Sequence, residues 1–188
     1  MKNLIIAITG ASGAIFGKRI LEVLKEQPDI NTHLIISQAA HITIKQELGI
    51  DAKELEQLAD KTYPYKDISA CLSSGSFKTD GMIIAPCSIK TMSEIANCIS
   101  GNLISRSADV ILKEKKKLLL CIRETPLHGL HLDNMKKLSD TGALIFPPVP
   151  AFYIKPKTID ELVNHTVGRM LDHFDIDSDL VKRWQGIK

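Results

Sequence analysis

The chain has 188 residues and a formal net charge of +2, with 44% hydrophobic and 24% charged residues. This length suits one domain with a buried core, and the composition is that of an ordinary globular protein. The small charge argues against nucleic acid or an anionic membrane as the main partner, and no apolar run is long enough to span a bilayer. The amino terminus leads straight into a short apolar run, so no signal peptide is expected.

The four cysteines do not follow the pattern of a metal site or of a disulfide framework. They stand at positions 71, 87, 98 and 121, without a Cys-x-x-Cys pair. We therefore expect reduced thiols, in a protein of the cytoplasm.

Short apolar runs alternate with helical patterns along the whole chain. In chain order we predict strand 4–8, helix 13 to about 27, strand 32–37, helix 39–48, helix 51–60, strand 81–86, helix 89–98, helix 105–116, strand 118–122, helix 131–140, strand 143–146 and helix 159–174. Runs such as LLLCI at 118–122 are continuously apolar, as in strands buried on both faces. The fold class is therefore α/β: a single flavodoxin-like or Rossmann-like domain over 1–188, a three-layer sandwich with a parallel sheet.

The first strand runs into a glycine-rich turn, TGASGAIFG at 9–17. Ligands of such sheets bind beyond the carboxyl ends of the strands. The glycines at 10, 13 and 17 break the Gly-x-Gly-x-x-Gly pattern of dinucleotide sites, and Ala14 breaks the short-chain dehydrogenase variant. The second strand ends in Ser37-Gln38, where an NAD site needs an acidic residue. A dinucleotide is not expected.

The features that remain fit a single phosphate. Gly10 and Gly13 let the backbone approach a ligand, the following helix offers unpaired N–H groups, and Ser12 adds a hydroxyl. PCSIKT at 86–91 repeats this design after the third strand. Ser12 or Ser88 taken alone is more often a helix N-cap than a ligand. Two hydroxyl-rich turns at neighbouring strand ends favour a mononucleotide.

Charged residues form a second set of candidates. Arg106 and Lys113, seven residues apart, project from one face of a predicted helix, where a solvated basic surface is the alternative. Arg123 and Glu124 emerge directly from a buried strand, either as an ion pair or as site groups.

Three further residues have two interpretations each. Tyr153 ends a proline-stiffened loop and is either a site group or a core tyrosine. Arg169, among apolar positions of the last helix, either reaches solvent or meets an anion. Glu47 is a surface residue unless a ligand lies beside it.

Several motifs together resemble one family. They are ITGASGA at 8–14, SSGS at 73–76, PCSIKT at 86–91, ADVILKE at 108–114, RETP at 123–126, PPVPAFY at 147–153 and RWQG at 183–186. In this order, from residue 2 to the C-terminus, they resemble the UbiX-type flavin prenyltransferases, formerly described as carboxy-lyases.

The resemblance implies a chemistry. Such enzymes join dimethylallyl phosphate to reduced FMN without a metal, building a ring across N5 and C6 of the flavin. The product, prenylated FMN, serves UbiD-type decarboxylases, including one in ubiquinone biosynthesis. The family forms homo-oligomers, dodecamers, with the site between neighbouring subunits. A tail at about 175–188 is expected in oligomer contacts.

The resemblance also implies site residues by position. FMN would be held by Gly10, Ala11, Ser12, Ser37, Ser88, Ile89, Lys90, Thr91 and Arg123. Dimethylallyl phosphate would be held by Tyr153, Arg169, Arg106 and Lys113. The catalytic set would be Ser12, Glu47, Arg106, Lys113 and Glu124, with Glu124 in proton transfer around the phosphate and flavin N5. Phe77 and Trp184 are further aromatic candidates for the prenyl pocket.

Two other functions share these features. One is an FMN-dependent decarboxylase of the cysteine-decarboxylating type, although Arg106, Lys113 and Arg169 favour a substrate that bears phosphate. The other is an FMN carrier or electron-transfer module without covalent chemistry, in which Arg123, Glu124 and Tyr153 would be structural.

Overall fold

The computed structural model describes residues 1–181, 183, 184 and 186. It contains a six-stranded sheet whose neighbouring strands are all parallel, in the order β3-β2-β1-β4-β5-β6. The strands are β1 (Lys2–Ile8), β2 (Ile30–Ile36), β3 (Lys61–Tyr63), β4 (Gly81–Cys87), β5 (Lys117–Ile122) and β6 (Leu144–Ile145). The strand order reverses between β1 and β4, and ligands of doubly wound sheets bind at this switch point.

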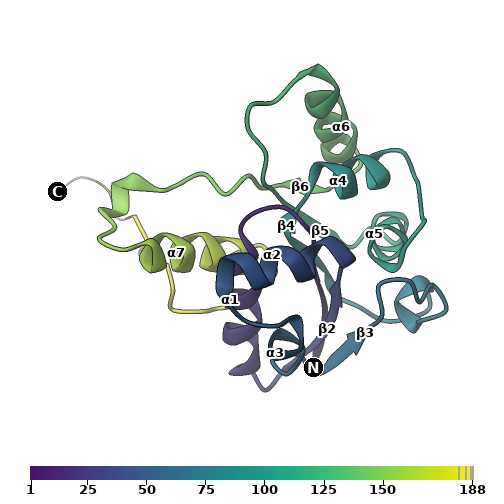
Figure 1. Cartoon of the computed structure of the whole chain (residues 1–188), viewed down its shortest axis with the longest axis horizontal. Helices are drawn as coiled ribbons and strands as arrows, with labels where there is room; N and C mark the ends of the chain where they lie inside the picture. The colour runs from purple at the N-terminus through teal and green to yellow at the C-terminus, as the bar shows by residue number, and fades with distance from the viewer. Residues whose placement is uncertain (182, 185, 187–188) are drawn as a thin grey trace.

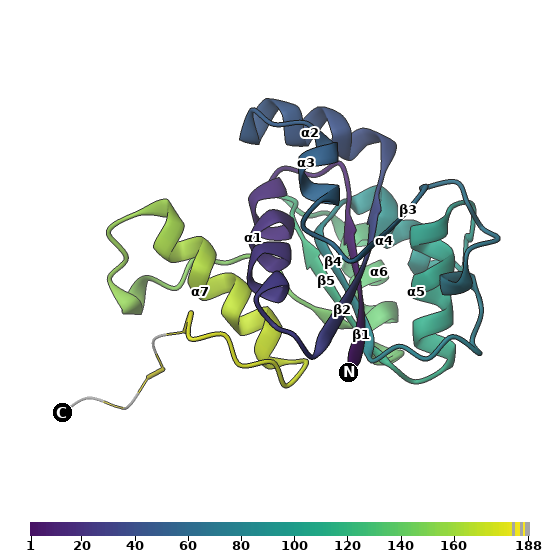
Figure 2. The ribbon, with the colours of Figure 1, turned by 90° about the horizontal axis from the view of Figure 1, so that it is seen from below.

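Helices cover both faces of the sheet (Figures 1 and 2). They are α1 (Ala14–Lys25), α2 (Gln38–Leu48), α3 (Ala52–Glu56), α4 (Ile89–Ala96), α5 (Leu103–Lys113), α6 (Gly129–Asp140) and α7 (Ile159–Asp172), with short 3-10 turns η1 (Cys71–Ser73) and η2 (Phe152–Ile154). Helices α1, α2, α3 and α7 share a core with one face, and α4, α5 and α6 with the other. The predicted three-layer α/β sandwich is confirmed.

Alternate residues of β1 enter different cores, because successive side chains of a strand point to opposite faces. Leu4, Ile6 and Ile8 pack with α1 and α7, whereas Ile5 and Ala7 pack with α4 and α5. All five side chains are at most 1% exposed. Burial on both faces explains why the central strands are uninterrupted apolar runs.

The two largest corrections to the predicted elements concern α3 and α5. The helix predicted over 51–60 ends at Glu56, and the edge strand β3 follows it. Three residues, two of them exposed, give β3 no apolar alternation to detect. The helix predicted over 105–116 begins at Leu103, because the Asn102 side chain caps it by accepting a hydrogen bond from the Ser105 N–H at 3.0 Å.

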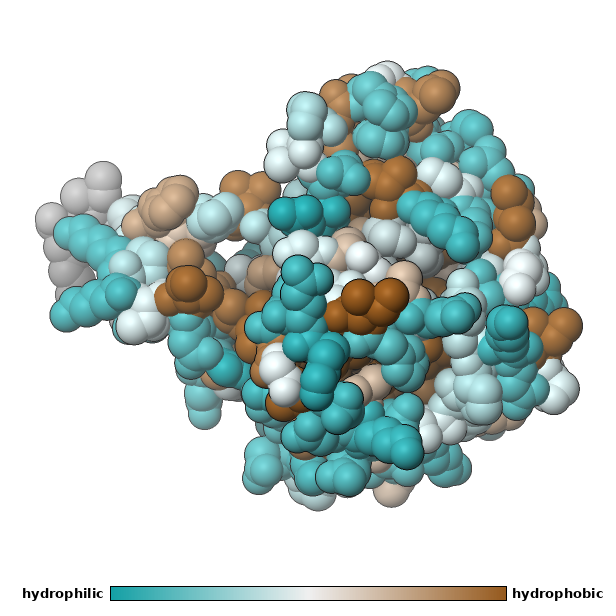
Figure 3. Space-filling model, viewed as in Figure 1, coloured by the Kyte–Doolittle hydropathy of each residue, from teal (hydrophilic) through white to brown (hydrophobic). Residues whose placement is uncertain are grey.

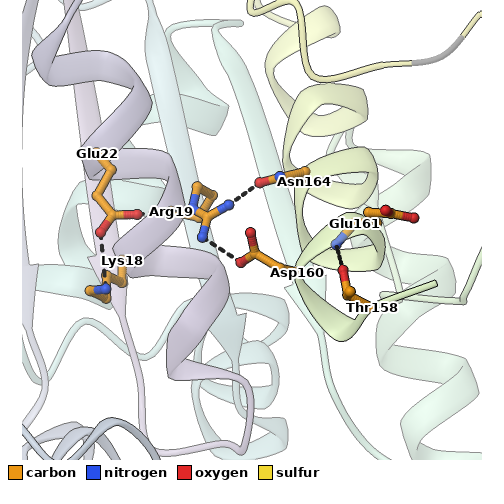
Figure 4. Close-up of polar contacts among 7 residues, drawn as sticks. All are labelled: Lys18, Arg19, Glu22, Thr158, Asp160, Glu161 and Asn164. Carbon is orange, nitrogen blue, oxygen red and sulfur yellow. Dashed lines mark hydrogen bonds and ion pairs between the residues drawn. The ribbon is translucent and has the colours of Figure 1, made fainter. Parts of the chain in front are cut away.

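The described residues after β6, called the extension below, project from the body of the molecule and return along α1 as helix α7, whose buried side chains join the core (Figures 1 and 2). Arg19 of α1 holds α7 to the body by donating to Asp160 Oδ1 at 2.6 Å and to Asn164 (Figure 4). Hydrophobic side chains gather on this extension (Figure 3). Those more than half exposed there are Val149, Phe152, Tyr153, Ile159 and Trp184. In one protomer these apolar side chains are therefore exposed to solvent.

The tail that was expected in oligomer contacts folds back on α7 in part. Arg183 pairs with Asp172, and the Trp184 ring meets the Tyr153 ring. Residues 182, 185, 187 and 188 of the tail, and with them one position of the RWQG motif, lie outside the described residues. The oligomer role of the tail stays a prediction.

Candidate functional site

Glycines shape the turn between β1 and α1. Gly13 is the N-cap of α1, with a φ of 106°, a left-handed conformation that favours glycine. A Cβ on Gly10 would lie 2.5 Å from the Cβ of Ala39, and one on Gly17 would lie 2.5 Å from the Ala85 carbonyl oxygen. The glycines therefore also permit close packing of the turn on α2 and of α1 on β4.

Glu47 occupies the N-terminus of α1. Its Oε2 accepts hydrogen bonds from the N–H groups of Gly13 at 2.9 Å and of Ala14 at 3.0 Å. The expectation that these amides are unpaired and free for a phosphate is wrong, because a carboxylate from α2 already complements this helix end. Glu47 is thus more than a solvated surface residue, since it fixes the turn that carries Ser12.

The serines of the other two turns are helix caps. Ser37 Oγ accepts a hydrogen bond from the Ala40 N–H at 3.2 Å, and Ser88 Oγ accepts one from the Thr91 N–H at 3.3 Å. Ser88 Oγ also donates to Thr91 Oγ1 at 3.1 Å. Ser12 is not a cap, because Gly13 takes that position, and its side chain is exposed. The capping interpretation is right for Ser88 and wrong for Ser12.

The N-terminus of α4 remains open to an anion. Ser88 caps the Thr91 amide, but within the described ranges no acceptor takes the amides of Ile89 and Lys90. The exposed Lys90 ammonium lies 3.7 Å from Glu94. Free amides at a helix start are donors for a phosphate or carboxylate.

Thr9 joins the two turns at the switch point. Its Oγ1 donates to the Pro86 carbonyl at 2.8 Å and accepts from the Ser88 N–H at 2.8 Å. The side chain is 1% exposed, so both bonds are shielded from water. This role of Thr9 has no signal in the sequence, because a threonine that ends an apolar run resembles any strand terminus.

Arg123 and Glu124 follow β5 at the same edge of the sheet. The Arg123 N–H donates to the Cys87 carbonyl at 3.2 Å, which sets this residue beside the Ser88 turn. Both side chains are exposed, and Glu124 Oε1 accepts a hydrogen bond from the Thr125 N–H at 2.9 Å. The ion pair between them, one of the two interpretations, does not form. Both charges are therefore available to groups outside this protomer.

Arg106 and Lys113 lie elsewhere, on α5. As predicted they share one face, next to residues 73–75: Arg106 Nε donates to the Ser73 carbonyl at 3.2 Å, and a Cβ on Gly75 would lie 2.7 Å from Lys113 Nζ. Arg106 pairs with Asp109 at 2.9 Å. Lys113 precedes the start of β5 and so lies toward the amino edge of the sheet, opposite the Ser88 turn. Within one protomer Lys113 is thus remote from the switch point, and the contacts of Arg106 are with Ser73 and Asp109.

Tyr153 and Arg169 both belong to the extension. The Tyr153 hydroxyl lies 3.2 Å from His165 Nε2, and the ring meets Trp184 edge to face with 5.9 Å between centroids. Arg169 pairs with Asp172 at 2.9 Å. Hydrogen bonds from Arg183, and then from Arg169, lower the pKa of Asp172.

The two other aromatic candidates have different surroundings. Trp184 is 63% exposed beside Tyr153. Phe77 packs edge to face on His33, with ring centroids 5.2 Å apart. Trp184 therefore lies next to Tyr153, a proposed substrate ligand, within one protomer.

The thiols and acids do not form a metal centre in the part of the chain that the structure describes. No group of three or more His, Cys, Asp or Glu side chains there could hold an ion. Cys87 and Cys121 are buried in the sheet, and burial raises the pKa of both thiols, that of Cys121 to about 12. No described helix is long and apolar enough to cross a bilayer.

Comparisons with known proteins agree over the whole chain. The sequence model of the family described as Flavoprotein matches residues 1–182. Flavin prenyltransferase UbiX of Escherichia coli K12 is 52% identical over 188 residues, which cover 99% of this chain and 100% of that protein.

Two solved structures share the fold closely. AnUbiX (PadA1), crystallised in complex with FMN and dimethylallyl pyrophosphate, has a TM-score of 0.97 and 46% identity, covering 100% of this chain and 99% of its own. A dodecameric FMN-dependent UbiX-like decarboxylase from Escherichia coli O157:H7 has a TM-score of 0.96 and 46% identity, covering 98% of this chain and 100% of its own. With the sequence match over its full length, the chain belongs to the family of UbiX-type flavin prenyltransferases.

Proposed function

We propose that the protein is a flavin prenyltransferase that joins the dimethylallyl group of dimethylallyl phosphate to N5 and C6 of reduced FMN, without a metal ion. The observation that carries the proposal is the switch point, where Thr9 ties two hydroxyl-bearing turns together beside the free amides of α4. Uncharged donors of this kind suit one phosphate monoester and a neutral ring system. The 52% identity to a flavin prenyltransferase supports the same reaction.

FMN would bind along the carboxyl edge of the sheet. Its ligands would be residues 10–12, Ser37, residues 88–91 and Arg123. The flavin supplies the nucleophilic N5 and C6 atoms. The chain supplies hydrogen-bond donors for the FMN phosphate and a rigid sheet edge against which the flavin ring can lie. The amides of Ile89 and Lys90 fit this purpose, because no described group uses them.

The prenyl phosphate would be bound by Arg106, Lys113, Tyr153 and Arg169. In one protomer these residues lie on opposite faces of the sheet, on α5 and on the extension. We therefore propose that the site forms between subunits of a homo-oligomer. A dodecamer is the form of the relative from Escherichia coli O157:H7. The exposed apolar side chains of the extension support such contacts.

These cations would stabilise the leaving phosphate. When the carbon–oxygen bond of dimethylallyl phosphate breaks, the bonding electrons remain on phosphate, and a guanidinium fork complements the charge that develops. Holding flavin and donor in contact allows the allylic carbon to be captured before water reaches it. Glu124 would accept and return protons around the phosphate and flavin N5, and Glu47 would hold the Ser12 turn against the reacting region.

The product would serve another enzyme. We propose that prenylated FMN passes to a UbiD-type decarboxylase, with ubiquinone synthesis as one such pathway. We also infer a cytoplasmic location, which the free thiols of all four cysteines support.

The test is an anaerobic incubation of the purified protein with reduced FMN and dimethylallyl phosphate, followed by mass spectrometry of the flavin. We expect a flavin heavier by one prenyl unit, and no change with dimethylallyl alcohol, which lacks the phosphate. Unchanged FMN in every sample would contradict the proposal. Release of carbon dioxide from a C-terminal cysteine peptide would instead support the cysteine-type decarboxylase.

A further inference from the structure

A buried histidine stands behind the exposed tyrosine of the extension. His165 lies on α7 and is 5% exposed, whereas Tyr153 is 54% exposed. The Tyr153 hydroxyl and His165 Nε2 are 3.2 Å apart, and the two rings meet edge to face with 5.7 Å between centroids. The tyrosine thus presents its ring to the outside while its hydroxyl is anchored from within.

The other ring nitrogen decides which group donates. His165 Nδ1 is buried and has no hydrogen-bond partner among the described residues. A buried N–H without an acceptor is more costly and rarer than a buried acceptor without a donor. Nδ1 is therefore the unprotonated nitrogen, and the ring hydrogen of a neutral His165 sits on Nε2.

The surroundings keep the ring neutral. Burial lowers the pKa of His165, and the Arg169 guanidinium lowers it further, whereas the Asp172 carboxylate acts in the opposite direction. In a neutral ring with Nε2 protonated, the bond to Tyr153 runs from the imidazole N–H to the phenol oxygen. The phenol hydrogen is then free to point away from His165.

We propose that His165 is a positioning residue: by donating from Nε2 to Tyr153 Oη, it turns the Tyr153 hydroxyl outward as a hydrogen-bond donor for a phosphate oxygen of the prenyl substrate. This inference rests on the proposed function, in which Tyr153 contacts that phosphate. The deprotonated oxygens of a phosphate only accept hydrogen bonds. A phenol that donated its hydrogen to the histidine would therefore present only oxygen lone pairs to the phosphate, and no hydrogen bond could form between them. Accepting a bond from His165 also polarises the phenol and strengthens its own donation.

Three substitutions separate this role from simple packing. His165→Gln places an amide N–H near the position of Nε2, His165→Asn places it near Nδ1, and His165→Leu removes it. We expect His165→Leu and His165→Asn to raise the KM for dimethylallyl phosphate about tenfold, as for a lost bond to a charged group. His165→Gln should stay within about threefold of wild type, and FMN affinity should be the same in all three.

Tyr153→Phe provides the second half of the test. If His165 acts through the phenol, adding His165→Leu to Tyr153→Phe raises the KM no further, because both changes remove one interaction. Additive effects, an unchanged KM in His165→Leu, or equal rescue by Asn and Gln would overturn the inference. If wild type forms no prenylated flavin, the proposed function fails first and the positioning role fails with it. If wild type is active and only the histidine series shows no effect, the positioning role alone fails.

Discussion

The carboxyl edge of the sheet and the cationic surfaces of α5 and the extension are built in different ways. At the sheet edge, hydrogen bonds of Thr9, Glu47 and Ser88 hold two turns and the end of α2 together within one protomer. The cations Arg106, Lys113 and Arg169 are instead between 37% and 49% exposed, and each pairs with a carboxylate within three residues of it on the chain. Under the proposed function, one protomer would thus fold the flavin site, whereas the anion site would need neighbouring subunits.

The difference follows from electrostatics. Backbone amides and hydroxyls can lie close together with little electrostatic repulsion, because they carry no net charge. Cationic side chains gathered in one place without a bound anion would repel each other. An ion pair between such a cation and a carboxylate at a partly exposed site contributes only about 0–1 kcal/mol to the stability of the fold. Such a weak pair can be exchanged for a phosphate when subunits and substrate come together.

The largest effect is expected from Glu124→Gln at the sheet edge. If Glu124 moves protons as proposed, loss of its carboxylate should slow prenyl transfer by about a thousandfold, in the range of general acid–base catalysis. FMN affinity, measured by fluorescence quenching, should not change. Glu26→Gln, which removes an exposed carboxylate at the far end of α1, is the matched control and should retain full activity. Normal turnover of Glu124→Gln would refute its proton-transfer role.

The next effect separates the two regions. Lys113→Ala should leave FMN affinity intact and reduce kcat/KM for dimethylallyl phosphate by about ten- to a hundredfold, since a charge-assisted bond to the phosphate is lost. Lys116→Ala removes another exposed cation of the same segment and is expected to behave as wild type. A loss of FMN affinity in Lys113→Ala would show that the two regions are not independent.

A smaller effect is expected at the link between the turns. Thr9→Val leaves the part-buried Ser88 N–H without its acceptor, so it should destabilise the protein by about 1–2 kcal/mol and weaken FMN binding. Thr9→Ser keeps the hydroxyl and should lose less than half as much. The measurement is denaturant unfolding with and without FMN. Equal stability of the valine and serine variants would mean that Thr9 does not tie the turns.

The smallest effect concerns the attachment of the extension. The hydrogen bond from Arg19, and its charge, lower the pKa of Asp160 below the ordinary value of 3.8. The stabilisation is therefore complete above that value and is lost as the pH falls through the lower folded pKa. We expect the Tm of wild type to fall more steeply below about pH 4 than that of Asp160→Asn. Asp133→Asn, at an exposed carboxylate on α6, should keep the wild-type slope; an equal slope in Asp160→Asn would count against the Arg19 contact.

Sequence patterns located the strand ends well, for a physical reason. Strands buried on both faces must be apolar throughout, so Gly10, Ser37, Ser88 and Arg123 are recognisable as the first residues beyond them. The resemblance to a family then predicted which of these residues would bind a flavin.

The links between the turns could not be predicted in this way. The bond from Thr9 to Ser88 and the cap that Glu47 supplies to α1 join residues distant in sequence, and neither has a local signal. The contact of His165 with Tyr153 depends on how the extension folds on α7. The separation of Arg106 from Arg169 across the sheet likewise follows from chain topology, which residue types do not reveal.

The central claim is that one subunit supplies the flavin edge and other subunits supply the cations. The most direct test is to co-express Glu124→Gln and Lys113→Ala subunits with different tags and to purify the mixed oligomers. If Glu124 and Lys113 of each site come from different subunits, random assembly restores both wild-type groups in about a quarter of the sites, and activity reappears accordingly. Mixed oligomers no more active than either variant alone would contradict the account.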